Sequence, residues 1–121
     1  MNTHELVMRR AIKTVEKYER SLSEKGIPAY MHTAVIGYVL HGWHPGDFLH
    51  AVISNNLTEA AGHADAINQP LLWNYCNWFY NHAPADCWGS ADSFARWQQL
   101  RTRPIPANVR VTYSDINEDL K

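Results

Sequence analysis

The fold is decided by the stretch from Ile27 to Trp97, which opens with Ile27-Pro28-Ala29-Tyr30, continues through His41-Gly42-Trp43-His44-Pro45-Gly46-Asp47 and passes Cys87-Trp88-Gly89-Ser90 near its end. Between these breaks, apolar residues recur every three or four positions, which is the spacing of an amphipathic helix. Glycine, proline and asparagine separate the apolar runs, as they do where helices begin and end. The stretch therefore predicts an all-α fold.

The spacing predicts a compact bundle of four main helices plus a short fifth helix. They cover about residues 2–25, 28–41, 45–61, 68–83 and 90–103. Asn2, with Glu5 three residues later, resembles a capping box, and Gly26 suits the end of the first helix. The second helix is apolar on most sides, so we expect it to be central. Asp65 or Asn68 is expected to cap the fourth helix, and Ser90 the fifth.

The same spacing predicts which side chains face the core. On the first helix they are Leu6, Met8, Ile12, Val15, Tyr18 and Leu22. On the third they are Phe48, Leu49, Val52, Ile53, Leu57 and Ala60, on the fourth Ile67, Leu71, Tyr75, Trp78 and His82, and on the fifth Phe94, Trp97 and Leu100.

Residues 1–103 are expected to form a single helical domain, and residues 104–121 an extended C-terminal tail. Pro104 stops the fifth helix, because an interior proline breaks a helical hydrogen bond. Beyond it, Val109-Arg110-Val111-Thr112-Tyr113 alternates like a strand, but no second strand is evident to pair with it.

Composition excludes several classes of protein. The chain has 121 residues, 45% of them apolar and 19% charged, which is typical of one globular domain. A formal net charge of −1 argues against a duplex nucleic acid partner, which would require a basic face. No apolar run is long enough to span a membrane, and the N-terminus lacks the pattern of a signal peptide. Two cysteines are too few for a disulfide framework, so we expect a cytoplasmic protein with reduced thiols.

A set of short motifs resembles a widespread group of small phage and prophage proteins that have no assigned activity. The motifs are Ile27-Pro28, Pro45-Gly46-x-Phe48-Leu49-x-Ala51-Val52, Ala64-Asp65-x-x-Asn68, Trp78-x-Tyr80-Asn81-x-Ala83-Pro84 and Cys87-Trp88-Gly89-Ser90. The resemblance covers roughly residues 27–97 and leaves out the first helix and the tail. Members often carry aspartate where this chain has Asn55 or Asn56, so that acidic position does not transfer. The resemblance implies a phage-encoded accessory protein in the bacterial cytoplasm.

The motifs give little support to a metal site or to an acid–base catalytic site. Seven histidines suggest a metal site, but the chain has neither Cys-x-x-Cys nor His-Glu-x-x-His, so we predict no metal and no other cofactor. The pairs His63 with Asp65 and His82 with Asp86 could serve an acid–base enzyme. Such pairs also arise by chance at helix ends, and Asp65 is better explained as a helix cap.

A small-molecule site is a stronger hypothesis. Helix N-termini present free N–H groups that suit phosphate, and aromatic faces beside them could stack a nucleotide base. The candidate ligand-binding residues are Trp43, His44, Trp88, Ser90 and Arg96. The alternative is structural: Trp88 would fill the core beside Trp78, and the Trp-Gly-Ser run would be a turn followed by a cap.

A protein-binding surface is the other hypothesis. Trp73 and Trp78 are five residues apart, so they point about 140° away from each other on a helix and cannot both face one core. An outward Trp73 with Asn77 and Tyr80 would form an interface for a partner or for a homo-oligomer. The alternative is a second buried surface beneath the first helix or the tail.

These observations predict a phage-encoded, non-enzymatic binding protein that counters or modulates a host defence process. It would sequester a small nucleotide signal or bind a host protein. One alternative is a structural or regulatory phage protein that acts only by self-association and protein contacts. A second alternative is a small hydrolase-type enzyme.

Overall fold

A computed structural model describes residues 2–102, and every regular element in that range is helical. The α-helices are α1 (Thr3–Glu24), α2 (His32–His41), α3 (Asp47–Ile53), α4 (Leu57–His63), α5 (Leu72–His82) and α6 (Ala91–Thr102). Three single 3₁₀ turns join them, at Ala29–Met31, Gln69–Leu71 and Ala85–Cys87. The all-α prediction is therefore confirmed for this range, whereas the expected tail and its alternating run lie outside the described residues.

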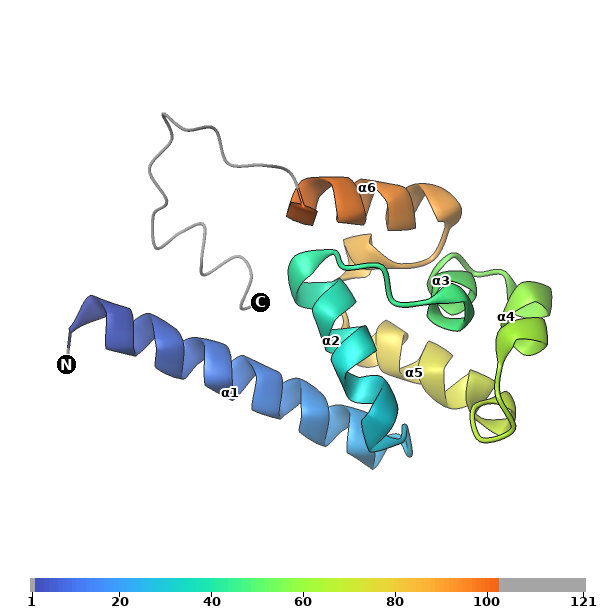
Figure 1. Ribbon diagram of the computed structural model, residues 1–121, viewed down its shortest axis with the longest axis horizontal. Helices are drawn as coiled ribbons and strands as arrows, with labels where there is room; N and C mark the ends of the chain where they lie inside the picture. Colours follow the sequence, from blue (N-terminus) through green and yellow to red (C-terminus); the bar gives the residue numbers. More distant parts are fainter. Residues whose placement is uncertain (1, 103–121) are drawn as a thin grey trace.

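The core is built around α2 and α5, as Figure 1 shows. From Val35 to Leu40 every residue of α2 is buried, which confirms that this helix is central. Tyr38 packs its ring parallel to that of Phe94 on α6, with the ring centroids 5.2 Å apart. The Trp97 indole N–H points to the carbonyl oxygens of Tyr38 and Val39, at 3.1 and 3.2 Å. These contacts hold α6 against the C-terminal end of α2.

Helix α1 is long, and its N-terminal half extends away from the other helices (Figure 1). The Asn2 side chain accepts the Glu5 N–H at 2.8 Å, which confirms the predicted cap. The predicted inward face is wrong in the first half of the helix, where Leu6, Met8 and Ile12 are 41%, 49% and 52% exposed. In the second half, Tyr18 and Leu22 are buried as expected.

The third predicted helix, over residues 45–61, is two helices. Asn55 adopts a left-handed conformation, with φ of 62°, and this breaks the helix. Asn56 then accepts the Glu59 N–H at 3.1 Å and starts α4, which packs back against α3. As a result Leu57, expected in the core, is 67% exposed at the start of α4.

The predicted helix caps and core residues in the second half of the chain are confirmed only in part. Asp65 accepts the Asn68 N–H at 2.7 Å, so it caps the turn that leads into α5 and not α5 itself. Ser90 accepts the Ser93 N–H at 3.0 Å and caps α6. Two predicted core residues are wrong, because Ile67 and Leu100 are 57% and 63% exposed. None of the described helices is both long enough and apolar enough to cross a lipid bilayer.

Candidate functional site

The outer face of α5 and Trp88 together form a groove of about 510 Å³, which we call the aromatic furrow. Its lining residues are Trp73, Cys76, Asn77, Tyr80, Asn81 and Trp88. Five of them follow the helical spacing i, i+3, i+4, i+7 and i+8, so they share one face of α5. Trp88 comes from the loop before α6 and lies with its ring centroid 6.1 Å from that of Tyr80. Two separate chain segments therefore build the furrow.

The furrow displays aromatic rings to solvent. Trp73 and Tyr80 are each 75% exposed, the largest fractions among the exposed large hydrophobic side chains. On the opposite face of α5, Tyr75, Trp78 and Phe79 are buried in the core. A helix that is apolar on both faces is normally covered on both. Helix α5 has only one face covered by the described helices.

All three predicted interface residues, Trp73, Asn77 and Tyr80, line this furrow. Sequence reasoning missed Cys76 and Asn81, although their spacing from Trp73 places them on the same face. Asn81 donates its side-chain N–H to the backbone oxygen of Asn77 at 2.9 Å and to its side-chain oxygen at 3.1 Å. These bonds link two lining residues that lie one helical turn apart.

A smaller depression adjoins each end of the furrow. Near Trp73, a depression of about 380 Å³ is lined by Glu24, Lys25, Gly26, Trp73, Asn74 and Asn77. Near Asn81, a depression of about 320 Å³ is lined by Lys13, Thr14, Lys17, Tyr18, Ser21, Asn81 and His82. Both lie where α1 runs beside α5, and they share residues with the furrow. The combined surface has an aromatic middle and charged ends.

The predicted ligand-binding residues lie in different parts of the fold. Trp43 packs against His41, with ring centroids 4.6 Å apart, in the loop after α2. His44 lies against Phe94 at 5.7 Å and accepts the Gly46 N–H at 3.1 Å. Of the remaining candidates, Ser90 caps α6, Arg96 is exposed on that helix, and Trp88 is part of the furrow. None of the described contacts joins Trp88 to Trp43.

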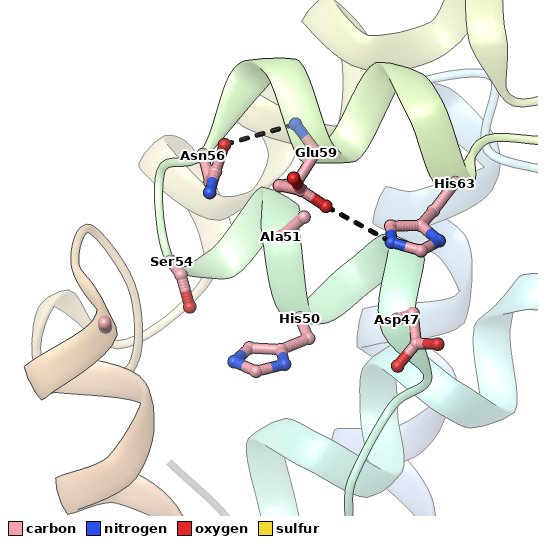
Figure 2. A pocket seen from close by; sticks show the side chains of 8 residues that line it. Asp47, His50, Ala51, Ser54, Asn56, Glu59 and His63 are labelled. Carbon is pink, nitrogen blue, oxygen red and sulfur yellow. Dashed lines mark hydrogen bonds and ion pairs between the residues drawn. The ribbon is translucent and has the colours of Figure 1, made fainter.

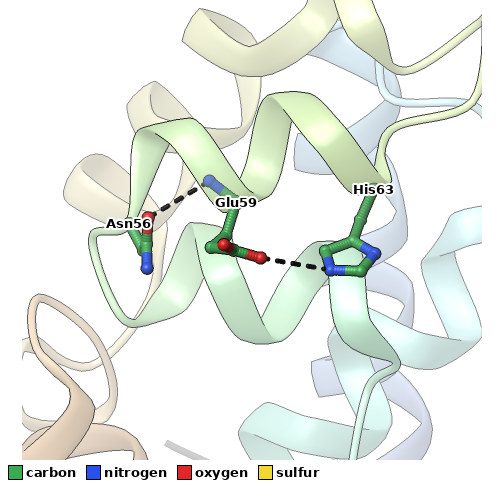
Figure 3. Close-up of polar contacts among 3 residues, drawn as sticks. All are labelled: Asn56, Glu59 and His63. Carbon is green, nitrogen blue, oxygen red and sulfur yellow. Dashed lines mark hydrogen bonds and ion pairs between the residues drawn. The ribbon is translucent and has the colours of Figure 1, made fainter.

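A second pocket, of about 250 Å³, lies between α3, α4 and the start of α6 (Figure 2). It is lined by Asp47, His50, Ala51, Ser54, Asn56, Glu59, His63 and Ala91. His63 pairs with Glu59 at 3.4 Å across one turn of α4, as Figure 3 shows. Both side chains are largely solvated, at 46% and 62% exposure, so water weakens the pair.

The histidine–carboxylate pair proposed from the sequence, His63 with Asp65, is not the one that forms. Asp65 instead accepts the Tyr30 hydroxyl at 2.6 Å and the Asn68 N–H at 2.7 Å. The Tyr30 hydroxyl group holds the Asp65 pKa below its ordinary value of 3.8, and the Asn68 N–H adds to this effect. Asp65 is therefore a structural acceptor, and the carboxylate next to His63 is that of Glu59.

Residues 2–102 offer no metal site. No group of three or more histidine, cysteine, aspartate or glutamate side chains in that range is arranged to hold a metal ion.

In the second pocket the Ser54 hydroxyl oxygen is buried and has no hydrogen-bond partner among the described residues. Within that part of the chain, Ser54 is therefore the one side chain of this pocket with a buried polar atom that lacks a partner.

Comparison of the chain with protein-family models, with curated proteins and with solved structures finds no match.

Proposed function

We propose that this protein is a non-enzymatic binding protein that acts through protein contacts made at the aromatic furrow. The observation that carries the proposal is the exposure of Trp73 and Tyr80, at 75% each, on the outer face of α5. Tryptophan and tyrosine are the residues that most often dominate the binding energy of protein interfaces. Exposed clusters of large apolar side chains on a soluble domain commonly mark such interfaces.

The chemistry of the lining favours a protein over a nucleotide. Among residues 2–102, the furrow is lined by aromatic, amide and thiol side chains and by no lysine or arginine. A nucleotide carries phosphates, which proteins bind with cations or with clusters of backbone N–H groups. Lys13 and Lys17 lie in the next depression, beyond Asn81. An apolar or aromatic surface of another protein would match the furrow without leaving a buried charge unpaired.

The second pocket supports catalysis less well. General acid–base chemistry works best where water is excluded and where the acid and base are held rigidly. The Glu59–His63 pair is more than two-fifths exposed on both sides and links side chains of the same short helix. The furrow presents the larger and more apolar surface.

The biological role that we propose rests on the resemblance to phage and prophage proteins. Binding through the furrow would modulate a host process, such as a defence response, in the bacterial cytoplasm. No turnover is needed for this role, because occupying a partner's surface is sufficient to block it.

The test compares capture of partners by furrow variants and by a matched control. The wild-type chain, the double variant Trp73→Ala/Tyr80→Ala and the control Ile67→Ala would each be purified from bacterial cytoplasm. Ile67 is 57% exposed and lies outside the furrow. Each bound protein would then be purified, and its affinity for the three chains measured by calorimetry. We expect the double variant to lose at least about tenfold in affinity, as for interface aromatics in general, and the control to bind like the wild type.

Two outcomes would contradict the proposal. Equal binding by all three chains would show that the furrow is not the working surface. Native mass spectrometry of the same preparations could instead reveal a nucleotide-sized adduct that disappears in Lys13→Ala/Lys17→Ala. That result would replace protein binding by nucleotide sequestration.

A further inference from the structure

We infer that the partner in the aromatic furrow is an acidic peptide segment, with an apolar anchor in the furrow and carboxylates beside Lys13 and Lys17. This inference rests on the proposed function and names the chemistry of the partner at the same surface. The depression of about 320 Å³ next to Asn81 contains both lysines, and we call it the basic depression. Asn81 also lines the furrow, so the two hollows meet at this residue.

The basic depression carries two positive charges. Lys13 and Lys17 are exposed, and neither lies within ion-pair distance of a carboxylate among residues 2–102. No aspartate or glutamate of that range lines the depression. The two lysines are four residues apart on α1, where like charges are neighbours and repel each other. A carboxylate placed between them would offset this repulsion, so the depression favours an acidic occupant.

The two ends of the furrow differ in charge. At the N-terminal end of α5, the depression near Trp73 contains Glu24 and Lys25, whose charges cancel. At the C-terminal end, the basic depression contains Lys13 and Lys17, whose charges add. Charge complementarity of this kind fixes the orientation of a bound partner. The acidic part of the segment therefore lies over the C-terminal end of α5, and its apolar anchor lies over the middle of the helix.

The length of the furrow limits the spacing between the anchor and the acidic residues of the partner. Trp73 and Asn81 are eight residues apart, which is about 12 Å along a helix axis. An extended chain advances about 3.3 Å per residue, so roughly four residues reach from one end of the furrow to the other. Tyr80 and Trp88, whose ring centroids are 6.1 Å apart, would contact the anchor. The acidic residues should therefore lie within about four positions of it.

A single-stranded nucleic acid also combines stacking bases with negative charge, but it matches this surface less well. Such a strand carries a phosphate at every nucleotide, so its binding groove needs cations along its whole length. Within residues 2–102 the furrow itself is lined by no lysine or arginine, and the depression near Trp73 contains Glu24. A peptide can carry its carboxylates at one end only, which is the distribution that this surface complements.

The test measures peptide binding to the full chain by fluorescence anisotropy. One labelled peptide joins a Leu-Trp-Leu anchor to a run of glutamates, and a second joins the same anchor to a run of lysines; each is made in both orders. We expect the glutamate peptide to bind at least about tenfold more tightly in dilute salt. The ratio should shrink in concentrated salt, because mobile ions screen exposed charges. Oligothymidylate, the third probe, should bind more weakly than the glutamate peptide.

Two double variants locate the carboxylates. Lys13→Gln/Lys17→Gln removes two positive charges, so it should lose about fivefold in affinity for the glutamate peptide and most of the salt dependence. Ala95→Glu/Gln99→Glu changes the net charge by the same amount at exposed positions of α6, outside both the furrow and the basic depression. This control should bind the glutamate peptide like the wild type.

Three results would overturn the inference. They are equal or absent binding of the glutamate and lysine peptides, unchanged binding of the glutamate peptide by Lys13→Gln/Lys17→Gln, and tighter binding of oligothymidylate. The capture experiment judges the proposed function separately. A captured protein that requires Trp73 and Tyr80 but binds Lys13→Gln/Lys17→Gln like the wild type would support the furrow and overturn its acidic partner.

Discussion

The indole N–H of Trp78 donates to the hydroxyl oxygen of Ser21 at 2.8 Å, and this contact joins α5 to α1. Both side chains are buried, and the Ser21 hydroxyl group donates in turn to the Tyr18 carbonyl oxygen at 2.9 Å. The Tyr18 ring meets the Trp78 ring edge-on at 5.7 Å. The contact acts together with the burial of Tyr75 and Phe79 to fix the rotation of α5. In that rotation Trp73 faces solvent.

Replacing Ser21 by alanine should destabilise the fold. The change leaves the Trp78 indole N–H buried without an acceptor, and a buried unsatisfied donor costs about 1–3 kcal/mol. Urea unfolding followed by circular dichroism would measure the loss. The control Ser23→Ala removes the same hydroxyl group from an exposed position two residues away and should change the free energy of unfolding by less than about 0.5 kcal/mol. Equal stability of the two variants would show that the Ser21–Trp78 contact contributes nothing.

Much of the helical arrangement could be predicted from local sequence because local chemistry determines it. Asn2 and Glu5 form the predicted cap, and Ser90 caps α6 as expected. The break after α3 could not be predicted in this way. Leu57 and Ala60 continue the helical spacing of α3, so the pattern predicts one helix. The turn at Asn55 forms because α4 folds back onto α3, and such a contact between segments is invisible to a pattern read along one helix.

The candidate site also has a part that could be predicted from the sequence and a part that could not. The angles between positions on one helix predicted that Trp73, Asn77 and Tyr80 share a face, and the structure places all three in the furrow. The sequence groups Trp88 with Trp43 and His44, because its loop precedes a helix start. Its position beside Tyr80 depends on how the chain turns between α5 and α6, where the Gly89 N–H donates to the Ile53 carbonyl oxygen at 2.8 Å. Spacing along the chain carries no information about that turn.

Two glycine-to-alanine substitutions should have opposite effects on stability. Gly42 has a φ of +70°, and an added Cβ would lie 2.7 Å from the Arg101 Cβ and 3.2 Å from the Gln98 backbone. Gly42→Ala should therefore destabilise the fold by about 1–3 kcal/mol, from backbone strain and from displacement of α6. Gly62 lies within α4 and has open space around it, so Gly62→Ala should stabilise by about 0.5–1 kcal/mol.

Thermal or urea unfolding of both variants checks this pair of predictions. Near-ultraviolet circular dichroism should also change in Gly42→Ala, because Trp97 on α6 packs against the end of α2. An unchanged free energy of unfolding in Gly42→Ala would contradict the prediction, because neither the backbone strain at a φ of +70° nor the contact with Arg101 would then carry a cost.

The hydrogen bond between Tyr30 and Asp65 should make the free energy of unfolding depend on pH in acidic solution. The Tyr30 hydroxyl group holds the Asp65 pKa below its ordinary value of 3.8 in the folded chain. A depressed folded pKa means that the ionised carboxylate favours folding. Its contribution is present above 3.8, the unfolded value, and is lost as the pH falls through the lower folded value.

Removing the Tyr30 hydroxyl group should therefore make the free energy of unfolding less dependent on pH in acidic solution. In Tyr30→Phe the Asp65 pKa moves back towards 3.8, so stability should fall less steeply as the pH drops below 3.8 than it does in the wild type. Tyr80→Phe removes a hydroxyl group from an exposed ring and serves as the control, with an unchanged slope. Carbon-13 titration of the Asp65 carboxyl group would report the pKa directly, and identical pKa values in wild type and Tyr30→Phe would contradict the prediction.

Cys87 should resist thiol reagents until the chain unfolds. The side chain is fully buried, and its carbonyl oxygen accepts the Tyr38 hydroxyl group at 2.7 Å, which ties its turn to α2. Burial raises the pKa of the thiol to about 12. Since only the thiolate reacts, the reactive fraction at pH 8 is on the order of 10⁻⁴ even before steric shielding is considered.

The Cys76→Ser variant isolates this thiol, because the chain has two cysteines. In native buffer it should take up no label from a disulfide reagent, and in denaturant it should take up one equivalent. Tyr38→Phe removes the hydrogen bond to the Cys87 carbonyl oxygen while keeping the ring that packs on Phe94. Combined with Cys76→Ser, it should speed labelling by lowering the free energy of unfolding by about 1 kcal/mol, roughly a fivefold effect. Fast labelling of native Cys76→Ser would mean that the turn holding Cys87 opens without unfolding of the core.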